Sequence, residues 1–135
     1  MKQRATMLII DRDRLLLVHR FKDGREYCVL PGGGVEEGET PEVACVREAM
    51  EETGLVVELG EKLAVLINNG REDHYFRIAR FTGIPQLGGP ERERQSLTNQ
   101  YHLEWVDSAQ LDRIELVPIE ARTLCREAFS SGETR

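Results

Sequence analysis

The chain has 135 residues, the size of one domain, and chains of this length bury roughly two-thirds of the surface that they expose when unfolded. Its content of 40% hydrophobic and 31% charged residues excludes a disordered or fibrous protein. A net charge of -6 argues against binding to a nucleic-acid polymer, which requires a basic surface to displace counterions from phosphates, but it allows small anionic ligands that a cation bridges.

The first third of the chain predicts three strands. Residues 5–10 and 14–20 are short aliphatic runs separated by the turn-forming sequence Asp-Arg-Asp, which indicates an antiparallel hairpin. Residues 26–31 predict a third strand, which ends at Pro31. The charges at 11–14 interrupt the apolar N-terminus before it reaches the length of a signal peptide or a membrane span.

A helix is predicted over residues 40–54. Thr40 is a good N-cap and Pro41 occupies the first helical position. Gly54 is a typical residue to end the helix. Apolar residues recur between these ends at helical spacing: Val43, Val46, Ala49 and Met50.

The remaining elements are strands at 56–68, 74–83 and 101–106 and a helix at 117–129. The segment 83–100 is rich in glycine, proline and charge, so it predicts a long surface loop that acts as a lid. The helix is expected to turn four residues inward: Val117, Ala121, Leu124 and Cys125. Residues 130–135 are expected to be a flexible tail. The order predicts an α/β (α+β) fold, a mixed β-sheet between α-helices, in a single domain over 1–135.

Three cysteines, Cys28, Cys45 and Cys125, are an odd number without metal-ligand spacing, and each lies in an apolar or helical context. Reduced, buried thiols in the cytoplasm fit this usage best. No segment approaches eighteen consecutive apolar residues, so a soluble protein is expected.

The helix at 40–54 carries an unusual acidic face. Glu48, Glu51 and Glu52 lie at i, i+3 and i+4, which places them on one side of the helix. Like charges at this spacing destabilise a helix by roughly 0.2–0.5 kcal/mol per pair, and only Arg47 accompanies them. A solvated acidic surface is the simpler interpretation, but such a surface normally alternates Glu with Lys.

A divalent cation would turn this repulsion into binding, because Mg²⁺ takes one or two carboxylates and completes its shell with water and substrate phosphate oxygens. The glycines at 32–34 allow a close backbone approach to a metal or an anion. A P-loop is excluded because no Lys-Ser or Lys-Thr follows these glycines. An EF-hand is excluded because its ligands come from a loop.

The segment from Gly33 to Leu55 resembles the complete box of the Nudix hydrolase family. The pattern is Gly33, five residues, Glu39, seven residues, and then the sequence REAMEETGL from Arg47 to Leu55. Every fixed letter of the box is matched, and Ala49 is the smallest aliphatic residue that it accepts. The box covers about a sixth of the chain, and the order of strands, long loop and terminal helix around it is also similar to small Nudix hydrolases.

The resemblance implies roles for individual residues. Glu51 and Glu52 would bind Mg²⁺ or Mn²⁺, with Glu48 as a further ligand or the general base, and Gly32 would offer its carbonyl. Arg47 would hold a catalytic glutamate by a charge-assisted hydrogen bond. Glu39 would support the junction of loop and helix, with Gly33 and Gly54 as structural glycines. Because the base varies within the family, two loop residues compete with Glu48: Glu91 and Glu93.

Outside the box the candidates are weaker. Arg20 ends a strand where the family often places a phosphate-contacting arginine, and an edge-strand charge in water is the alternative. Arg92 and Arg94 could reach a substrate from the loop, although a solvated loop is the simpler interpretation. Core packing is favoured over base stacking for three aromatic residues, Tyr75, Phe76 and Trp105. Three isolated histidines receive no role: His19, His74 and His102.

The resemblance implies a metal-dependent pyrophosphohydrolase that cleaves a nucleoside diphosphate linked to a further group X by attack of activated water. Its partners would be a small-molecule nucleotide and Mg²⁺ or Mn²⁺, without a nucleic-acid polymer or a membrane, and the chain would act as a monomer or homodimer. The alternatives are a nucleotide-binding sensor on the same fold and a purely structural domain. Nothing in the sequence identifies X.

Overall fold

The computed structural model describes residues 1–88, 95–96 and 98–130. Its first sheet has the strand order β5-β1-β7-β6. The sheet is mixed, because β1 runs parallel to β7 whereas the other neighbouring pairs are antiparallel. Its strands are β1 (Lys2–Leu8), β5 (Gly32–Gly34), β6 (Val56–Asn68) and β7 (Arg71–Thr82).

The second sheet is antiparallel and is centred on β3. Strand β8 pairs along one edge of β3, while β2 and β4 pair with successive parts of β3. Its strands are β2 (Ile10–Asp11), β3 (Arg14–Lys22), β4 (Arg25–Val29) and β8 (Asn99–Val106).

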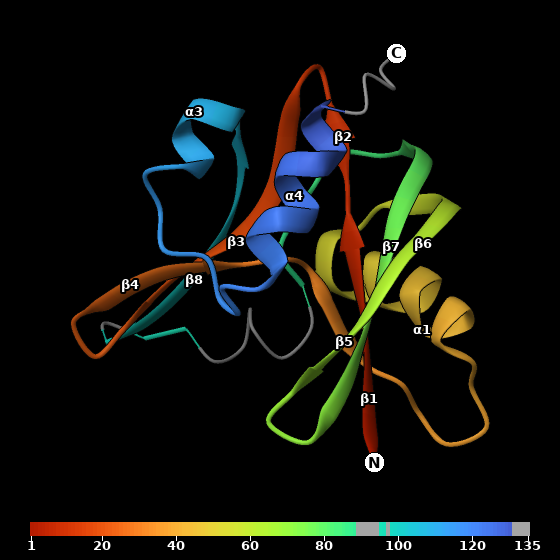
Figure 1. Cartoon of the computed structure of the whole chain (residues 1–135). Coiled ribbons are helices and arrows are strands. Elements are labelled where there is room, and N and C mark those ends of the chain that lie inside the picture. The colour runs from red at the N-terminus through yellow and green to blue at the C-terminus, as the bar shows by residue number, and fades with distance from the viewer. Residues whose placement is uncertain (89–94, 97, 131–135) are drawn as a thin grey trace.

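Helices cover both sides of the strands. In Figure 1, α4 (Ala121–Ser130) lies in front of the strands, and α1 (Pro41–Glu48) lies behind them. Buried residues of α4 share one apolar cluster with Leu17 of β3 and Tyr75 of β7. Buried residues of α1 share the other with Leu16 of β3 and Phe76 of β7. The predicted mixed sheet between helices is therefore confirmed.

The predicted hairpin is correct only at its tip. Arg12 and Asp13 form a tight turn with φ of 53° and 63°, and β2 pairs with the first residues of β3 around it. The rest of the first aliphatic run leaves the hairpin, because β1 pairs with β5 and β7 of the other sheet. Neighbouring runs in the sequence therefore belong to different sheets.

The helix of the box is present, but most of its periodic apolar residues face outward. Ala49 is fully buried, whereas Val43, Val46 and Met50 have exposed fractions of 40–55%. The inner side of the helix is made by smaller residues, among them Ala44 and Cys45. Small side chains let α1 pack closely on the first sheet.

The C-terminal helix starts later than predicted. It begins at Ala121 instead of 117, and Val117 precedes it in a cis peptide bond with Pro118. Ala121 and Cys125 are buried as expected, and Leu124 packs against the same cluster. Two short elements were not predicted from the sequence: β5 and α3 (Ser108–Leu111).

All three cysteines are buried, as expected, and each is a free thiol in the structure. Burial raises the pKa of each thiol to about 12. No helix among the described residues is long and apolar enough to cross a membrane.

Candidate active site

The acidic face lies where α1 changes its geometry. Thr40 caps the helix by accepting a hydrogen bond from the Val43 amide at 3.1 Å. After Glu48 the helix widens into a π-helical turn, Ala49–Thr53, and Gly54 ends it with a φ of 76°. Such turns are frequent at functional sites, and the left-handed conformation of Gly54 is one that few other residues adopt without strain.

Arg47 connects the acidic groups of this face. Its guanidinium makes a bidentate contact with Glu39, with Nε and Nη2 donating over 2.7 and 2.9 Å. Its Nη1 donates to both Glu48 and Glu51 at 3.0 Å, and Nη2 also donates to the Gly34 carbonyl. The face that the sequence predicts to repel itself is thus partly neutralised by one cation.

The remaining contacts of the face involve the glycines before the helix. The Gly32 amide donates to Glu52 Oε1 at 2.6 Å, and Glu52 is only 5% exposed. The Glu48 carboxylate lies where a Cβ at Gly33 would be, so any side chain there would displace that carboxylate. We call Gly32, Glu39, Arg47, Glu48, Glu51 and Glu52 the box cluster.

The two ends of the box cluster differ electrostatically. The hydrogen bonds from Arg47 to Glu39, together with the amide of Glu36, lower the pKa of the Glu39 carboxyl to about 2. Burial raises the pKa of Glu48, against the opposing effect of Arg47. Glu39 is therefore a permanently charged partner of Arg47, whereas Glu48 is the carboxylate that accepts a proton more readily.

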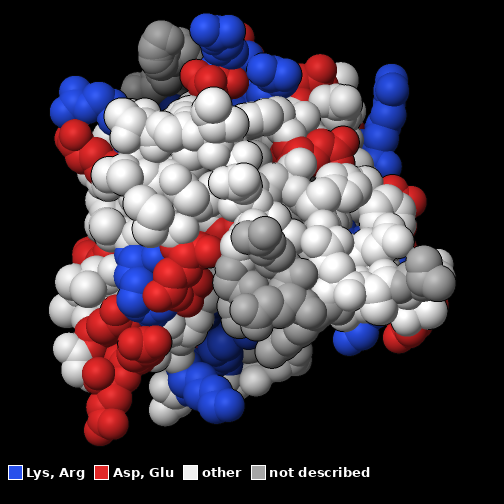
Figure 2. Space-filling model, turned by 180° about the vertical axis from the view of Figure 1, so that it is seen from behind, with Lys and Arg blue, Asp and Glu red and all other residues white. Residues whose placement is uncertain are grey.

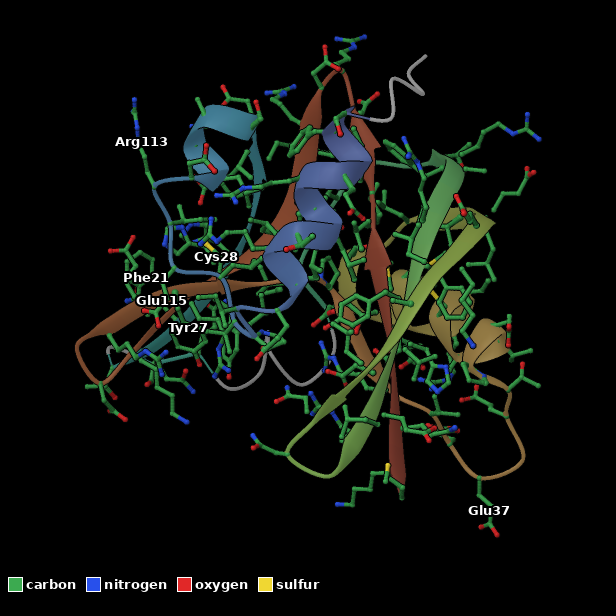
Figure 3. All side chains as sticks on the ribbon, in the orientation of Figure 1. Phe21, Tyr27, Cys28, Glu37, Arg113 and Glu115 are labelled. Atoms are coloured by element: carbon green, nitrogen blue, oxygen red, sulfur yellow. The ribbon has the colours of Figure 1, made fainter. Side chains whose placement is uncertain are left out.

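Figure 2, which views the molecule from behind, shows this charge distribution on the surface. Acidic side chains surround a basic group on the left, above the acidic loop that precedes α1. Glu37, labelled in Figure 3, projects from the tip of that loop. Within the box cluster, Glu51 is the most accessible carboxylate, with 54% of its side chain exposed.

The atoms of the box cluster that can bind a metal ion are carboxylate oxygens and the carbonyl oxygen of Gly32. Oxygen ligands of this kind suit a hard cation. Three carboxylates, from Glu48, Glu51 and Glu52, leave the same helix. In the described part of the chain their oxygens do not all lie within 4.8 Å of one another. Arg47 contacts one oxygen of Glu48 and one oxygen of Glu51, so a cation could bind the other oxygen of each carboxylate without displacing the guanidinium.

Next to the box cluster is a cavity of about 240 Å³. Both sheets and the segment before α4 contribute to its wall, and Glu52 is the member of the box cluster that lines it. Three arginines also line it: Arg4, Arg20 and Arg71. Arg71 is paired with Asp73, which lines the same cavity, so Arg4 and Arg20 are the cationic groups that this ion pair does not neutralise.

Arg20 is held rigidly in the cavity wall. Its Nη2 donates to the Tyr101 hydroxyl at 2.7 Å, and its guanidinium carbon lies 4.4 Å from the centre of the Tyr101 ring. The ring of Tyr27 contacts it at 5.3 Å. Its Nε is buried and has no hydrogen-bond partner among the described residues.

The structure brings some of the sequence-predicted residues together and leaves others out. Arg20 reaches the same cavity as Glu52, and the roles of the box residues stay predictions. Four loop candidates lie outside the described residues: Glu91, Arg92, Glu93 and Arg94. Tyr75 and Phe76 are buried, and Trp105 packs against the second apolar cluster, as core packing predicts.

Sequence reasoning missed the residues that strand pairing brings to the cavity. Arg4 of β1 is paired with Asp73 of β7, and Tyr101 of β8 is paired with Arg20. It also treated the histidines as isolated, although His19 and His102 are directly opposite each other on β3 and β8. No local signal identifies such pairs, because they depend on the order of the strands.

The chain matches the family model described as NUDIX domain over residues 1–126. It is similar to an ADP-ribose pyrophosphatase of Methanocaldococcus jannaschii, with 44% identity over 83 residues, covering 60% of this chain and 49% of that protein. A MutT-like protein of Streptomyces ambofaciens is 40% identical over 67 residues, 50% of this chain and 42% of that one. The chain thus spans about half the length of these curated relatives.

The fold has close counterparts among solved structures. The ORF135 protein of E. coli superposes with a TM-score of 0.78 at 22% identity, covering 100% of this chain and 95% of that one. At this identity the likeness shows a shared fold only.

Proposed function

Since this chain belongs to the NUDIX family, we propose that it is a divalent-metal-dependent pyrophosphohydrolase acting on a nucleoside diphosphate linked to a group X. One observation carries the proposal: Glu52 belongs to the box cluster and also lines the cavity. The carboxylates suited to a cation therefore border the space suited to a ligand. A solvated acidic surface would not require one of its carboxylates to line a cavity.

The box cluster fits Mg²⁺ or Mn²⁺ by the chemistry of its donors. Glu51 and Glu52 would hold the ion, with the Gly32 carbonyl and, where it does not act as the base, Glu48 as further oxygens. Bound there, the ion supplies a water of lowered pKa and neutralises charge on the phosphates. All four groups come from a glycine segment and a helix that Arg47 ties together through Gly34 and two glutamates.

Glu48 is the residue that we assign as general base. Burial raises its pKa, so its carboxylate accepts a proton more readily than an exposed glutamate does. Arg47 orients it through a hydrogen bond of 3.0 Å, and Glu39 fixes Arg47 from the other side. Glu91 and Glu93 are the competing bases from the loop.

The cationic wall of the cavity binds the substrate in this proposal. The guanidinium of Arg20, which lines the cavity, donates to a phosphate or base oxygen, while Tyr101 and Tyr27 hold it in place. Arg4 adds positive charge along the same wall, whereas the charge of Arg71 is neutralised there by Asp73. The loop 83–100 is proposed to act as a lid that contributes to substrate choice.

The nature of X is the open part of the activity. The Methanocaldococcus relative is named as an ADP-ribose pyrophosphatase, which makes ADP-ribose one candidate. Nucleoside triphosphates, oxidised nucleotides and dinucleoside polyphosphates are the others, because all of them contain a nucleoside diphosphate. We propose a single domain over residues 1–135 that acts as a monomer or homodimer in the cytoplasm.

The test is a panel of these nucleotides with Mg²⁺ or Mn²⁺, in which released phosphate, pyrophosphate or mononucleotide is measured. We expect turnover of at least one nucleotide that stops in excess EDTA. Tight binding without turnover would favour the alternative of a nucleotide-binding sensor. A protein with neither binding nor a response to Mg²⁺ would be a structural domain.

A further inference from the structure

Four side chains from three strands of the second sheet meet on one face of that sheet. His19 of β3 is directly opposite His102 of β8, and Glu104 lies two residues further along β8. Glu26 of β4 approaches from the other edge of β3. We call His19, Glu26, His102 and Glu104 the strand cluster. It lies on the face opposite to Arg20, because successive side chains of a strand point to opposite sides.

The donor atoms of the strand cluster are close enough for one ion. His19 Nδ1 lies 2.5 Å from Glu104 Oε1, and His102 Nε2 lies 3.8 Å from the same oxygen. One ligand atom from each of these three residues lies within 4.8 Å of the others. A tetrahedral ion with bonds of 2.0–2.2 Å separates its ligand atoms by about 3.4 Å. Small movements of the half-exposed His102 and Glu104 reach this separation.

The second nitrogen of His19 has the partner that a metal-bound histidine usually has. His19 Nε2 lies 2.7 Å from Glu26 Oε2. An ionised carboxylate only accepts hydrogen bonds, so a neutral His19 can donate to only one of its two glutamates. When the proton is on Nε2 and bonds to Glu26, the lone pair of Nδ1 is available to a metal ion. Glu26 then fixes the tautomer, as outer carboxylates do in metal sites.

Packing also holds the ring in this orientation. The rings of His19 and Phe21 are stacked, with their centres 4.6 Å apart and an angle of 20° between their planes. Phe21 contacts His102 as well, at 5.7 Å between ring centres. Figure 3 labels Phe21 near the β4 and β8 end of the sheet, away from α1. A ligand whose ring is already fixed loses little freedom when it binds an ion.

We propose that the strand cluster is a binding site for a first-row transition-metal ion of the Zn²⁺ type, with His19 Nδ1, His102 Nε2 and Glu104 as ligands. Two imidazoles suit Zn²⁺, Ni²⁺ or Cu²⁺, whereas Mg²⁺ takes oxygen ligands. The site is thus chemically distinct from the box cluster. It joins β3 to β8 directly behind Arg20 and Tyr101, so a bound ion stabilises the strands that carry the cavity wall. A fourth position stays open to water.

The test is calorimetric titration of the tag-free full chain with Zn²⁺ in a large excess of Mg²⁺, which keeps the oxygen ligands of the box cluster occupied. We expect one Zn²⁺ per chain and a rise in melting temperature. His102→Gln and Glu104→Gln should each weaken binding at least tenfold. Glu26→Gln should weaken it by about tenfold, because it removes only the outer partner of His19.

A matched control is Glu58→Gln. Glu58 is a half-exposed strand glutamate that pairs with Arg80 on the first sheet, so its loss removes a surface carboxylate without touching the strand cluster. Its Zn²⁺ affinity should equal that of the wild type. Copper(II) bound to the wild type should show coupling to two nitrogen ligands in its electron paramagnetic resonance spectrum, and His102→Gln should reduce this to one.

Two results would overturn the proposal. The first is unchanged Zn²⁺ affinity in both His102→Gln and Glu104→Gln, which would place the ion elsewhere. The second is no Zn²⁺ binding by the wild type, which would make the strand cluster a set of side-chain hydrogen bonds and not a metal site. Circular dichroism of each variant identifies any that does not fold. If one ligand variant unfolds, the other ligand variant decides the matter.

Discussion

The box cluster and the strand cluster both place carboxylates beside nitrogen-containing side chains, one arginine in the first and two histidines in the second. In the box cluster Arg47 donates to Glu39, Glu48 and Glu51, and all members come from residues 32–52. In the strand cluster His19 lies between Glu26 and Glu104, which are separated by 78 positions. The first is assembled by a loop and a helix, and the second by strand pairing.

This difference sets what each cluster can bind. The guanidinium of Arg47 cannot lose its proton, so the box cluster keeps a fixed cation and offers only oxygen atoms to a metal. The imidazoles of the strand cluster exchange protons for metal and offer nitrogen atoms. One molecule thus carries an oxygen site at its cavity and a nitrogen-rich site on the far side of a sheet.

Glu52→Gln gives the largest expected effect on activity. It changes the box cluster and leaves the strand cluster untouched. The amide keeps an oxygen for the Gly32 amide and removes the charge beside the cavity. We expect kcat to fall by about 10³-fold, within the range of losing a catalytic carboxylate. Initial rates with saturating Mg²⁺ measure this, with Glu58→Gln as control. The melting temperature should change little, and equal rates in the two variants would refute the assignment.

Arg47→Lys tests whether the box cluster works as one unit. Lysine keeps the charge but loses the bidentate contact with Glu39 and the link between Glu48 and Glu51. We expect a drop in kcat of about 10- to 100-fold and a lower melting temperature. The matched control is Arg80→Lys, because Arg80 makes the same bidentate contact with Glu58 on the surface. A similar loss in both variants would contradict the account.

Arg20→Lys tests the cavity wall, which lies between the two clusters. The variant loses the planar guanidinium that Tyr101 orients, together with its unpartnered Nε. We expect KM to rise by about tenfold with kcat nearly unchanged. This pattern indicates the loss of an interaction that is equally strong in the bound substrate and in the transition state. Arg25→Lys is the control, since Arg25 also lies over Tyr27 but pairs with the exposed Glu115. An unchanged KM would remove Arg20 from the substrate site.

The smallest effect is on acid stability. Arg47 lowers the pKa of Glu39 to about 2 in the folded protein, so the unfolded chain binds the proton more readily. The stabilisation is therefore complete above pH 4.5 and is lost as pH falls towards 2. Urea unfolding of the wild type and Glu39→Gln at pH 7 and pH 3 should differ more at pH 7. A constant difference would mean that Glu39 does not act through its charge.

The box cluster could be predicted from the sequence because its order is local. A cap at Thr40, a helical spacing and Gly54 fix which residues share a helix face, and the glycines precede them directly. What the sequence could not indicate is the burial of each carboxylate. Glu52 is buried and Glu51 is exposed although they are neighbours, because only Glu52 turns towards Gly32 and the cavity.

The strand arrangement could be predicted only in part. Aliphatic runs identified most strands, but pairing depends on contacts between distant segments, so β1 was assigned to the wrong neighbour. The same limit hid the strand cluster: His19 and His102 meet only because β8 pairs with β3. Val43 and Val46 show a third limit, since their helical spacing was correct although their side chains face outward.

The most direct test of the central claim is hydrolysis of the nucleotide panel in water enriched in oxygen-18, with Mg²⁺ and then with excess EDTA. We predict that the full chain cleaves at least one nucleoside diphosphate derivative, that one oxygen-18 enters a phosphate product at each cleavage, and that EDTA abolishes the reaction. Turnover that continues in excess EDTA would contradict the account, as would the absence of turnover with every nucleotide.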